Sequence, residues 1–338
     1  MFMKGKMKMS TIKEYFKVCL LTAFIAFLFA TCRKDTLESE TNIIQDTQQD
    51  NYTSMSDFYK KNAVGMQTFS VTAATGGTFA TPQGTQVTIP GLAFMTLSHI
   101  PVDTGTVKIE FKDIYKRSDM LLSDMPTMTQ SGPLKSGGEF FMRATINGVP
   151  LQLLPSASIT IVQPFGTFAR DSMTAFVERD SIGMKGWVAP PTDTIGNPVY
   201  SVVSNVSSYI FSFYQFASPE DSGTWCNSDN KNYFLTYPTT GLTLHETDNP
   251  DTFHTDVFLV FKNIDCMVHV YRGLGSDYPY LFAPQGLACT IVAVGEKGGA
   301  LYASFTSDTI GSNQTVNFAL SKTNTDAFKT SLKALDNQ

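Results

Sequence analysis

Short apolar segments follow one another along the chain from Thr68 onward, and each alternates or runs apolar for only five to eight residues. In the first half they are 68–73, 85–90, 105–111, 139–145, 157–164 and 173–178. Turn-forming residues fill the gaps, and Asn147-Gly148 is a strong hairpin signal because both residues tolerate positive φ. Many short strands at this spacing predict a β-sandwich.

The second half repeats the pattern and ends differently. Its predicted strands are 199–206, 209–216, 256–261, 267–272, 288–294 and 301–306. Near the end, Phe328, Leu332 and Leu335 fall at i, i+4 and i+7, which predicts a short amphipathic helix with Thr325 as its N-cap. We therefore expect a mainly β protein, in which a β-sandwich precedes a second β-rich domain (β-sandwich or α+β) with a short C-terminal helix.

The first 31 residues have another pattern. Five lysines precede the 13-residue run "VCLLTAFIAFLFA" (18–30). A helix of this length measures about 20 Å, short of the ~30 Å hydrocarbon core of a bilayer. The combination is typical of a secretory signal. The polar segment that follows predicts a solvated tether, which we place at 32–66.

The junction "LFATCRKD" (28–35) resembles a bacterial lipoprotein signal. That resemblance implies that Cys32 receives a diacylglycerol and becomes the first residue of a membrane-anchored protein. The expected location is the outer membrane or cell surface, and the periplasmic face also fits. Thr31 departs from the small residue usual before the cysteine. The alternative is cleavage after Ala30, which would release a soluble secreted protein.

The segments "GGTFATPQGTQVTIPGLAF" (76–94) and "SGGEFFMRATINGVPLQLLPSASITIVQP" (136–164) resemble a ZU5-like β-sandwich of Bacteroidota envelope lipoproteins. The resemblance covers about 67–165 and rests on apolar and glycine positions, so it implies a fold and no chemistry. Some ZU5-containing proteins cleave themselves at a His-Phe-Ser step. None of the four histidines here is followed by phenylalanine, so self-cleavage is not implied.

Turn formers in "GWVAPPTDTIGNPV" (186–199) predict a boundary. The chain then divides into a signal (1–31), the tether (32–66), a ZU5-like sandwich (67–185) and a β-rich C-terminal domain (199–338). We expect Trp187 to dock one domain on the other, because a lone large ring in a polar segment usually packs on something.

Charge and cysteine content limit the partners. The net charge is −5 and no basic stripe is present, which disfavours nucleic acid as a partner. Outside the signal and Cys32, three cysteines remain: Cys226, Cys266 and Cys289. At most one disulfide can form among them, and buried thiols are the alternative.

Searches for catalytic motifs give little. The chain contains no Gly-x-Ser-x-Gly, P-loop or His-Glu-x-x-His motif. Asn227, Asp229 and Lys231 alternate as in a calcium loop, but Lys231 would repel the ion and no glycine follows in register. We therefore expect no cofactor and no enzymatic activity.

One histidine pair offers a weaker alternative. A turn over 248–251 would place His245 opposite His254, with Asp256 on the same face and Glu246 on the other. Two imidazoles and a carboxylate are zinc ligands. The preferred interpretation is a solvated hairpin tip without metal.

Two further patterns point to surface properties. Tyr278, Tyr280 and Phe282 alternate, so their rings would share one face, either stacking on a sugar or another apolar partner or, as we favour, lying in a core. Asp-Ser/Thr followed by an aliphatic residue, Met, Thr or Cys resembles the O-glycosylation site of exported Bacteroidota proteins. The candidate positions are Thr36, Ser172, Ser181, Thr194 and Thr309.

These observations favour a non-enzymatic envelope lipoprotein, anchored to the membrane by lipid, whose β-modules bind a protein or glycan or act as a scaffold. The alternatives are an accessory subunit of a surface assembly and, less favoured, a metal-dependent hydrolase at His245 and His254.

Overall fold

Antiparallel strands dominate the computed structural model, which describes residues 50–165, 172–181, 184–192, 197–205, 207–216, 223–248 and 254–338. Within these residues one large sheet is accompanied by a five-stranded, a three-stranded and a two-stranded sheet, and helices are few and short. The mainly β fold expected from the sequence is confirmed.

The large sheet comprises 13 strands in the described part of the chain, each antiparallel to its neighbours. Its order is β12 (Met184–Val188), β11 (Thr174–Ser181), β15 (Thr224–Asn230), β8 (Lys135–Ile146), β5 (Thr106–Ile114), β1 (Gln67–Thr72), β2 (Gly76–Ala80), β3 (Gln86–Pro90), β10 (Ile159–Pro164), β14 (Ser208–Phe213) and β13 (Tyr200–Ser204). Off this path, β4 (Phe94–Thr96) pairs with β9 (Val149–Leu153), which also pairs with β8.

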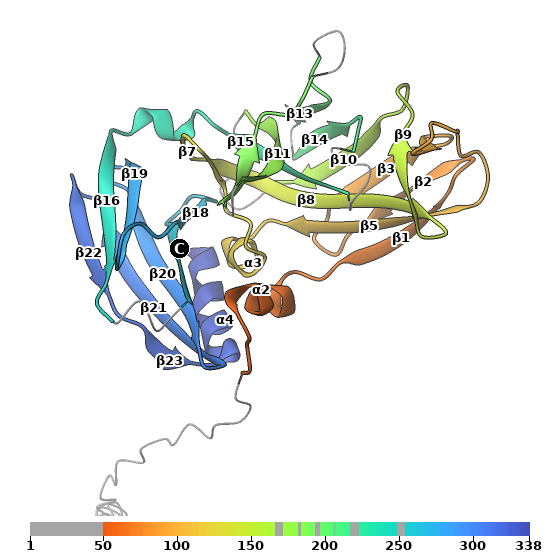
Figure 1. Cartoon of the computed structure of the whole chain (residues 1–338). Helices are drawn as coiled ribbons and strands as arrows, with labels where there is room; N and C mark the ends of the chain where they lie inside the picture. Colours follow the sequence, from red (N-terminus) through yellow and green to blue (C-terminus); the bar gives the residue numbers. More distant parts are fainter. Residues whose placement is uncertain are drawn as a thin grey trace, which may run out of the picture. The chain divides into compact units, whose positions relative to one another are not determined.

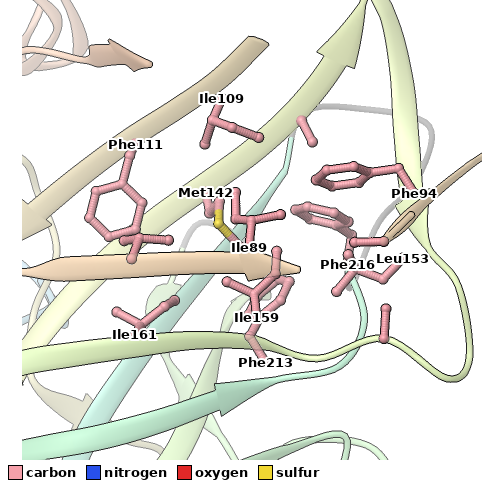
Figure 2. Packing of buried hydrophobic residues seen from close by; sticks show 14 of the residues in the cluster. Ile89, Phe94, Ile109, Phe111, Met142, Leu153, Ile159, Ile161, Phe213 and Phe216 are labelled. Carbon is pink, nitrogen blue, oxygen red and sulfur yellow. The ribbon is translucent and has the colours of Figure 1, made fainter. Parts of the chain in front are cut away.

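This sheet folds over on itself, so that β8 and β5 lie in one layer and β10 and β14 in the other (Figure 1). Apolar side chains from both layers fill the space between them (Figure 2). Strand β5 illustrates the alternation: Val107, Ile109 and Phe111 are fully buried, whereas Lys108 is exposed. Each such buried side chain contributes roughly 1.5–3 kcal/mol, so this core is the main stabilising element of the sheet.

The predicted hairpin at Asn147-Gly148 is confirmed. It joins β8 to β9, and both residues have positive φ, 50° and 80°. This is the backbone of a two-residue turn whose twist matches that of the flanking strands.

The last third of the chain forms two facing sheets. The five-stranded sheet has the order β18 (Met267–Val270), β17 (His254–Phe261), β20 (Ala288–Lys297), β21 (Ala300–Thr309) and β23 (Ser321–Thr323). The three-stranded sheet has the order β19 (Asp277–Pro284), β16 (Thr239–Glu246) and β22 (Gln314–Phe318). Leu244 and Tyr278 of the smaller sheet pack with Leu259 and Ile291 of the larger one.

The opposite face of the five-stranded sheet is covered by helices. They are α2 (Met55–Asn62), α3 (Arg117–Leu122) and α4 (Thr325–Ala334), which ends in a 3₁₀ turn (Leu335–Asn337). Strand β17 is therefore buried on both faces, which explains its unbroken apolar run. The predicted terminal helix is confirmed, but Asn324, not Thr325, is its N-cap.

The expectation of a tether up to residue 66 is wrong for its last part. Helix α2 lies there, and Met55, Phe58 and Tyr59 are buried against the five-stranded sheet and α4. Their spacing of three and four residues gives a short apolar helix face, which the polar surroundings masked.

The boundary expected between residues 185 and 199 does not separate the sheets. Strands β13, β14 and β15 follow it in sequence, yet all three belong to the large sheet, and β15 inserts between β8 and β11. The chain leaves the large sheet after Asn230 and enters the smaller one at Thr239. The place where the chain passes from one sheet to the other is set by pairing between strands that are distant in sequence. Turn-forming residues indicate local turns and do not indicate such pairing.

Cys32 lies outside the described residues. Within them, none of the helices combines the length and the apolar character needed to cross a bilayer.

Candidate functional site

Two edge strands enclose a cavity whose lining surface is mostly apolar. Strand β12 is the edge strand at one end of the large sheet. Strand β19 is one of the two edge strands of the three-stranded sheet. A cavity of about 370 Å³ lies between them. All five residues of β12 and the stretch Pro279–Phe282 of β19 line it, together with 128–130, Arg179, His269 and Tyr271.

A second cavity of about 470 Å³ adjoins the first. The two share Thr129 and Phe282 as lining residues, and the second continues past Phe234, Leu235 and Tyr237. We call the pair the Phe282 cleft.

Exposed apolar side chains gather around the Phe282 cleft. Of eleven large apolar side chains exposed in the described structure, four line it: Met184, Leu235, Leu281 and Phe282. Leu281 is 70% exposed and Phe282 is 41% exposed. Exposed apolar side chains gathered in one place mark binding sites more often than scattered ones do, so this cleft is the candidate functional site.

A β-bulge turns Phe282 into the cleft. In the pairing of β16 with β19, Thr240 lies opposite Ala283 but Leu242 lies opposite Tyr280, so Leu281 and Phe282 together oppose Gly241. The extra residue breaks the alternation of side chains. Tyr280 and Ala283 therefore point into the core while Leu281 and Phe282 both point outward. The core interpretation is confirmed for Tyr278 and Tyr280 and wrong for Phe282.

Trp187 fixes the wall formed by β12. Its ring is buried with Met125, Leu134 and Phe176, and its Nε1–H donates to the carbonyl oxygen of Pro126 at 2.8 Å. The segment that carries Pro126 in turn bonds to β18 through Thr127 and Met267. The expected docking role of Trp187 thus appears as a tie between the edge of the large sheet and the five-stranded sheet.

A partly buried charge network borders the first cavity, and Lys185 and His269 of this network line it. The ring of His269 stands between two carboxylates, with Nδ1 3.6 Å from Asp124 and Nε2 3.5 Å from Asp256. Asp124 also pairs with Lys185 at 3.1 Å, and Asp256 accepts a hydrogen bond from the Tyr59 hydroxyl at 2.7 Å. Burial alone would lower the pKa of His269, but the nearby carboxylates of Asp124 and Asp256 favour the imidazolium, outweigh burial and raise the pKa to about 9.

The predicted opposition of His245 and His254 is wrong. Strand β16 carries His245 and β17 carries His254, and the two strands lie in different sheets. His245 faces Asp277, with its Nδ1 2.7 Å from that carboxylate, and His254 pairs with Glu296. Asp256 does meet a histidine, but it is His269. Non-local pairing overrode the local hairpin that the turn residues indicated.

Within the described residues, no three or more His, Cys, Asp and Glu side chains gather in a manner suited to a metal ion.

The state of the three remaining cysteines is buried thiol rather than disulfide: Cys226, Cys266 and Cys289 are all free and buried. Burial raises the pKa of each thiol, which makes the thiolate scarce.

The candidate glycosylation positions divide by location. Ser172 precedes β11 and Thr309 ends β21, and both are exposed. Ser181 is in β11, but its side chain, like Thr36 and Thr194, lies outside what the structure describes.

Comparison with models of known protein families gave no match, and comparison with curated proteins gave no significant match either. The interpretation of the Phe282 cleft therefore rests on its own geometry.

Proposed function

We propose that this chain is a non-enzymatic, lipid-anchored envelope protein that docks an extended apolar segment of a partner protein in the Phe282 cleft. The observation that carries the proposal is the ring of exposed apolar side chains around two connected cavities. Exposed Leu281 and Phe282 cost free energy in water, and a partner that covers them recovers it.

The shape of the site favours an extended peptide. Both walls, β12 and β19, are edge strands, and edge strands offer backbone donors and acceptors to an added strand. Two neighbouring cavities that share Thr129 and Phe282 in their linings suit two apolar side chains of the same segment. Apolar side chains, among them the exposed Met184, Leu281 and Phe282, form most of the lining surface of the first cavity, and this supports an apolar protein segment over a glycan.

A photo-crosslinking experiment in intact cells tests the docking site. A benzophenone amino acid replaces Leu281 in one variant and Leu274 in a matched control. Leu274 is 93% exposed in the turn before β19 but does not line the cleft. We expect one discrete adduct from position 281, none from position 274, and loss of the adduct when Phe282→Ala is added.

The outcomes separate the candidate ligands. An adduct that protease digests supports a protein partner, whereas an adduct that resists protease but yields to glycosidase assigns the cleft to a glycan. Equal labelling at both positions, or none, contradicts a binding role for the cleft.

The anchor is tested separately. We expect Cys32→Ala to abolish labelling by radioactive palmitate and to move the protein from the membrane to the soluble fraction. The change removes the only thiol to which the signal resemblance assigns a lipid. A mature N-terminus at unmodified Thr31 would contradict the anchor and leave the cleft proposal intact.

A further inference from the structure

A third cavity lies beside β13, the strand at the opposite end of the large sheet from β12. Its volume is about 830 Å³, within the roughly 300–1,000 Å³ that is usual for ligand sites. Strands β4 and β9 contribute Met95, Gln152 and Leu153 to its lining, and the segment after β14 contributes Tyr214 and Gln215. Leu153 also belongs to the core of the large sheet, so the cavity rests on a packed base (Figure 2). We call it the Tyr214 cavity.

The lining of the Tyr214 cavity is uncharged. None of the eleven described residues that line it is an aspartate, glutamate, lysine or arginine. The Phe282 cleft differs, because Arg179 and Lys185 line its first cavity and Lys231 lines its second. Proteins usually hold anionic ligands with arginine or lysine and hard cations with carboxylates. The Tyr214 cavity therefore suits a ligand without net charge.

Polar side chains in this lining are open to a ligand. Within the described part of the chain, the side chains of Gln152, Tyr214 and Gln215 form no hydrogen bond with another residue. A side-chain amide carries both donors and an acceptor, and the tyrosine hydroxyl can act as either. The hydroxyl groups of a sugar also donate and accept, so amides and sugar hydroxyls are matched partners.

The ring of Tyr214 supplies an apolar surface in the same place, and it is 41% exposed. Its backbone N–H donates to the carbonyl oxygen of Val199 at 3.2 Å. The carbonyl oxygen of Gln215 accepts from the hydroxyl of Tyr200 at 2.5 Å. These bonds hold the segment so that two consecutive side chains, Tyr214 and Gln215, both lie at the surface. An exposed ring held in this way can stack on the C–H face of a pyranose.

The backbone around the cavity is already paired within the chain. The N–H of Val199 donates to the carbonyl oxygen of Pro191 at 3.0 Å, and the Val199 carbonyl accepts from Tyr214. Met95 lies opposite Gln152 in the pairing of β4 with β9. An added peptide strand is recognised mainly through free backbone groups. Recognition at this cavity therefore falls to side chains, which favours a glycan over an extended peptide.

We propose that the Tyr214 cavity binds a short neutral glycan. One sugar ring stacks on Tyr214, and sugar hydroxyls form hydrogen bonds with the amides of Gln152 and Gln215. The uncharged lining, the open amides and the exposed ring support this assignment together. The cavity shares no lining residue with the Phe282 cleft and does not depend on the function proposed for that cleft.

Saturation-transfer difference NMR on the purified protein tests the proposal. The neutral probes are maltotriose, cellotriose, mannotriose and triacetylchitotriose, and trigalacturonate is the matched acidic probe. The protein is kept in a detergent without a sugar headgroup, because a glucoside would compete for the site. We expect at least one neutral trisaccharide to receive saturation from the protein and trigalacturonate to receive none.

Variants then place the binding at this cavity. Tyr214→Ala should weaken the affinity for the bound trisaccharide about tenfold, whereas Tyr214→Phe keeps the ring and should retain most of it. Gln152→Leu should also weaken binding, because it removes the amide at similar size. The control is Val203→Ala, whose side chain is 58% exposed on β13 and does not line the cavity. It should bind like the parent, and circular dichroism checks that each variant is folded.

Three outcomes would overturn the proposal. They are the absence of saturation in all four neutral trisaccharides, an unchanged affinity in Tyr214→Ala, and a preference for trigalacturonate. An end-blocked Ser-Ala-Ser peptide serves as a further neutral probe. Binding of this peptide in place of the sugars would assign the cavity to a protein partner and would also contradict the proposal.

Discussion

At the scale of single residues, His269 shows how the fold assigns a charge that the sequence does not specify. As one of four histidines in the chain, it has no distinguishing neighbours in sequence. Its two carboxylate neighbours come from distant segments, because Asp124 follows α3 and Asp256 lies on β17, while Tyr271, two residues further along the same segment, stacks on the ring at 4.3 Å. The carboxylates keep the imidazolium protonated at neutral pH even though it is buried.

This arrangement predicts a pH dependence of stability. The folded pKa of about 9 exceeds the ordinary value of 6.5, so the stabilisation is complete below about pH 6.5 and is lost as pH rises through 9. The full contribution is of the order of 3 kcal/mol. We expect the free energy of unfolding, measured with urea between pH 6 and 9.5, to fall across this window.

The control for this prediction is His269→Gln, which keeps a polar side chain but cannot titrate. It should be less stable than the parent at pH 6 and should remove most of the slope above pH 6.5. An unchanged slope in this variant would assign the pH dependence to other groups.

At the scale of elements, α4 depends on a cap that lies one position before the predicted one. Asn324 has extended backbone, and its side-chain oxygen accepts a hydrogen bond from the Ala327 N–H at 2.9 Å. Thr325 is instead the first residue of the helix, and its hydroxyl lies 2.5 Å from that of Tyr52. Asn and Thr are both favourable N-cap residues, so the sequence alone does not show which of the two positions is the N-cap. The extended backbone at Asn324 identifies it.

We expect Asn324→Ala to destabilise the protein by about 1 kcal/mol, because it leaves a helix N–H without its acceptor. The matched control is Thr330→Ala, an exposed mid-helix position whose hydroxyl only bonds back to the Asp326 carbonyl. That change should be neutral or slightly stabilising. Denaturant unfolding at pH 7 measures both, and equal effects would show that Asn324 does not act as a cap.

At the scale of the whole described chain, residues 50–338 form one compact unit, although they contain two sheet assemblies. Strand β15 ties the later sequence into the large sheet, and Trp187 ties β12 to the segment beside β18. Arg117 of α3 donates to the carbonyls of Phe261 on β17 and Leu335 after α4. These contacts join residues on both sides of a domain boundary placed between residues 185 and 199, so they argue against two independent domains.

We therefore expect a single cooperative unfolding transition, with tryptophan fluorescence and far-UV circular dichroism changing at the same denaturant concentration. Limited proteolysis should not release two resistant halves cut between 179 and 198. Two separated transitions, or two such fragments, would restore the division into independent domains.

The periodicity of the sequence determined the class of fold, most of the strands, the Asn147-Gly148 hairpin and the terminal helix. These features depend on local alternation and on backbone preferences of single residues, which the sequence displays directly. It also supplied the signal pattern at Cys32, which is a local signal of the same kind.

The tertiary structure alone decided which strands pair, and with them every candidate site. The separation of His245 from His254, the meeting of Asp256 with His269 and the meeting of Gln152 with Tyr214 at one cavity all depend on how distant segments pair. Phe282 was hidden for a related reason, because a bulge shifts register by one residue and reverses which face a side chain occupies. Pairing and register depend on the packing of the whole sheet, and no local pattern encodes that packing.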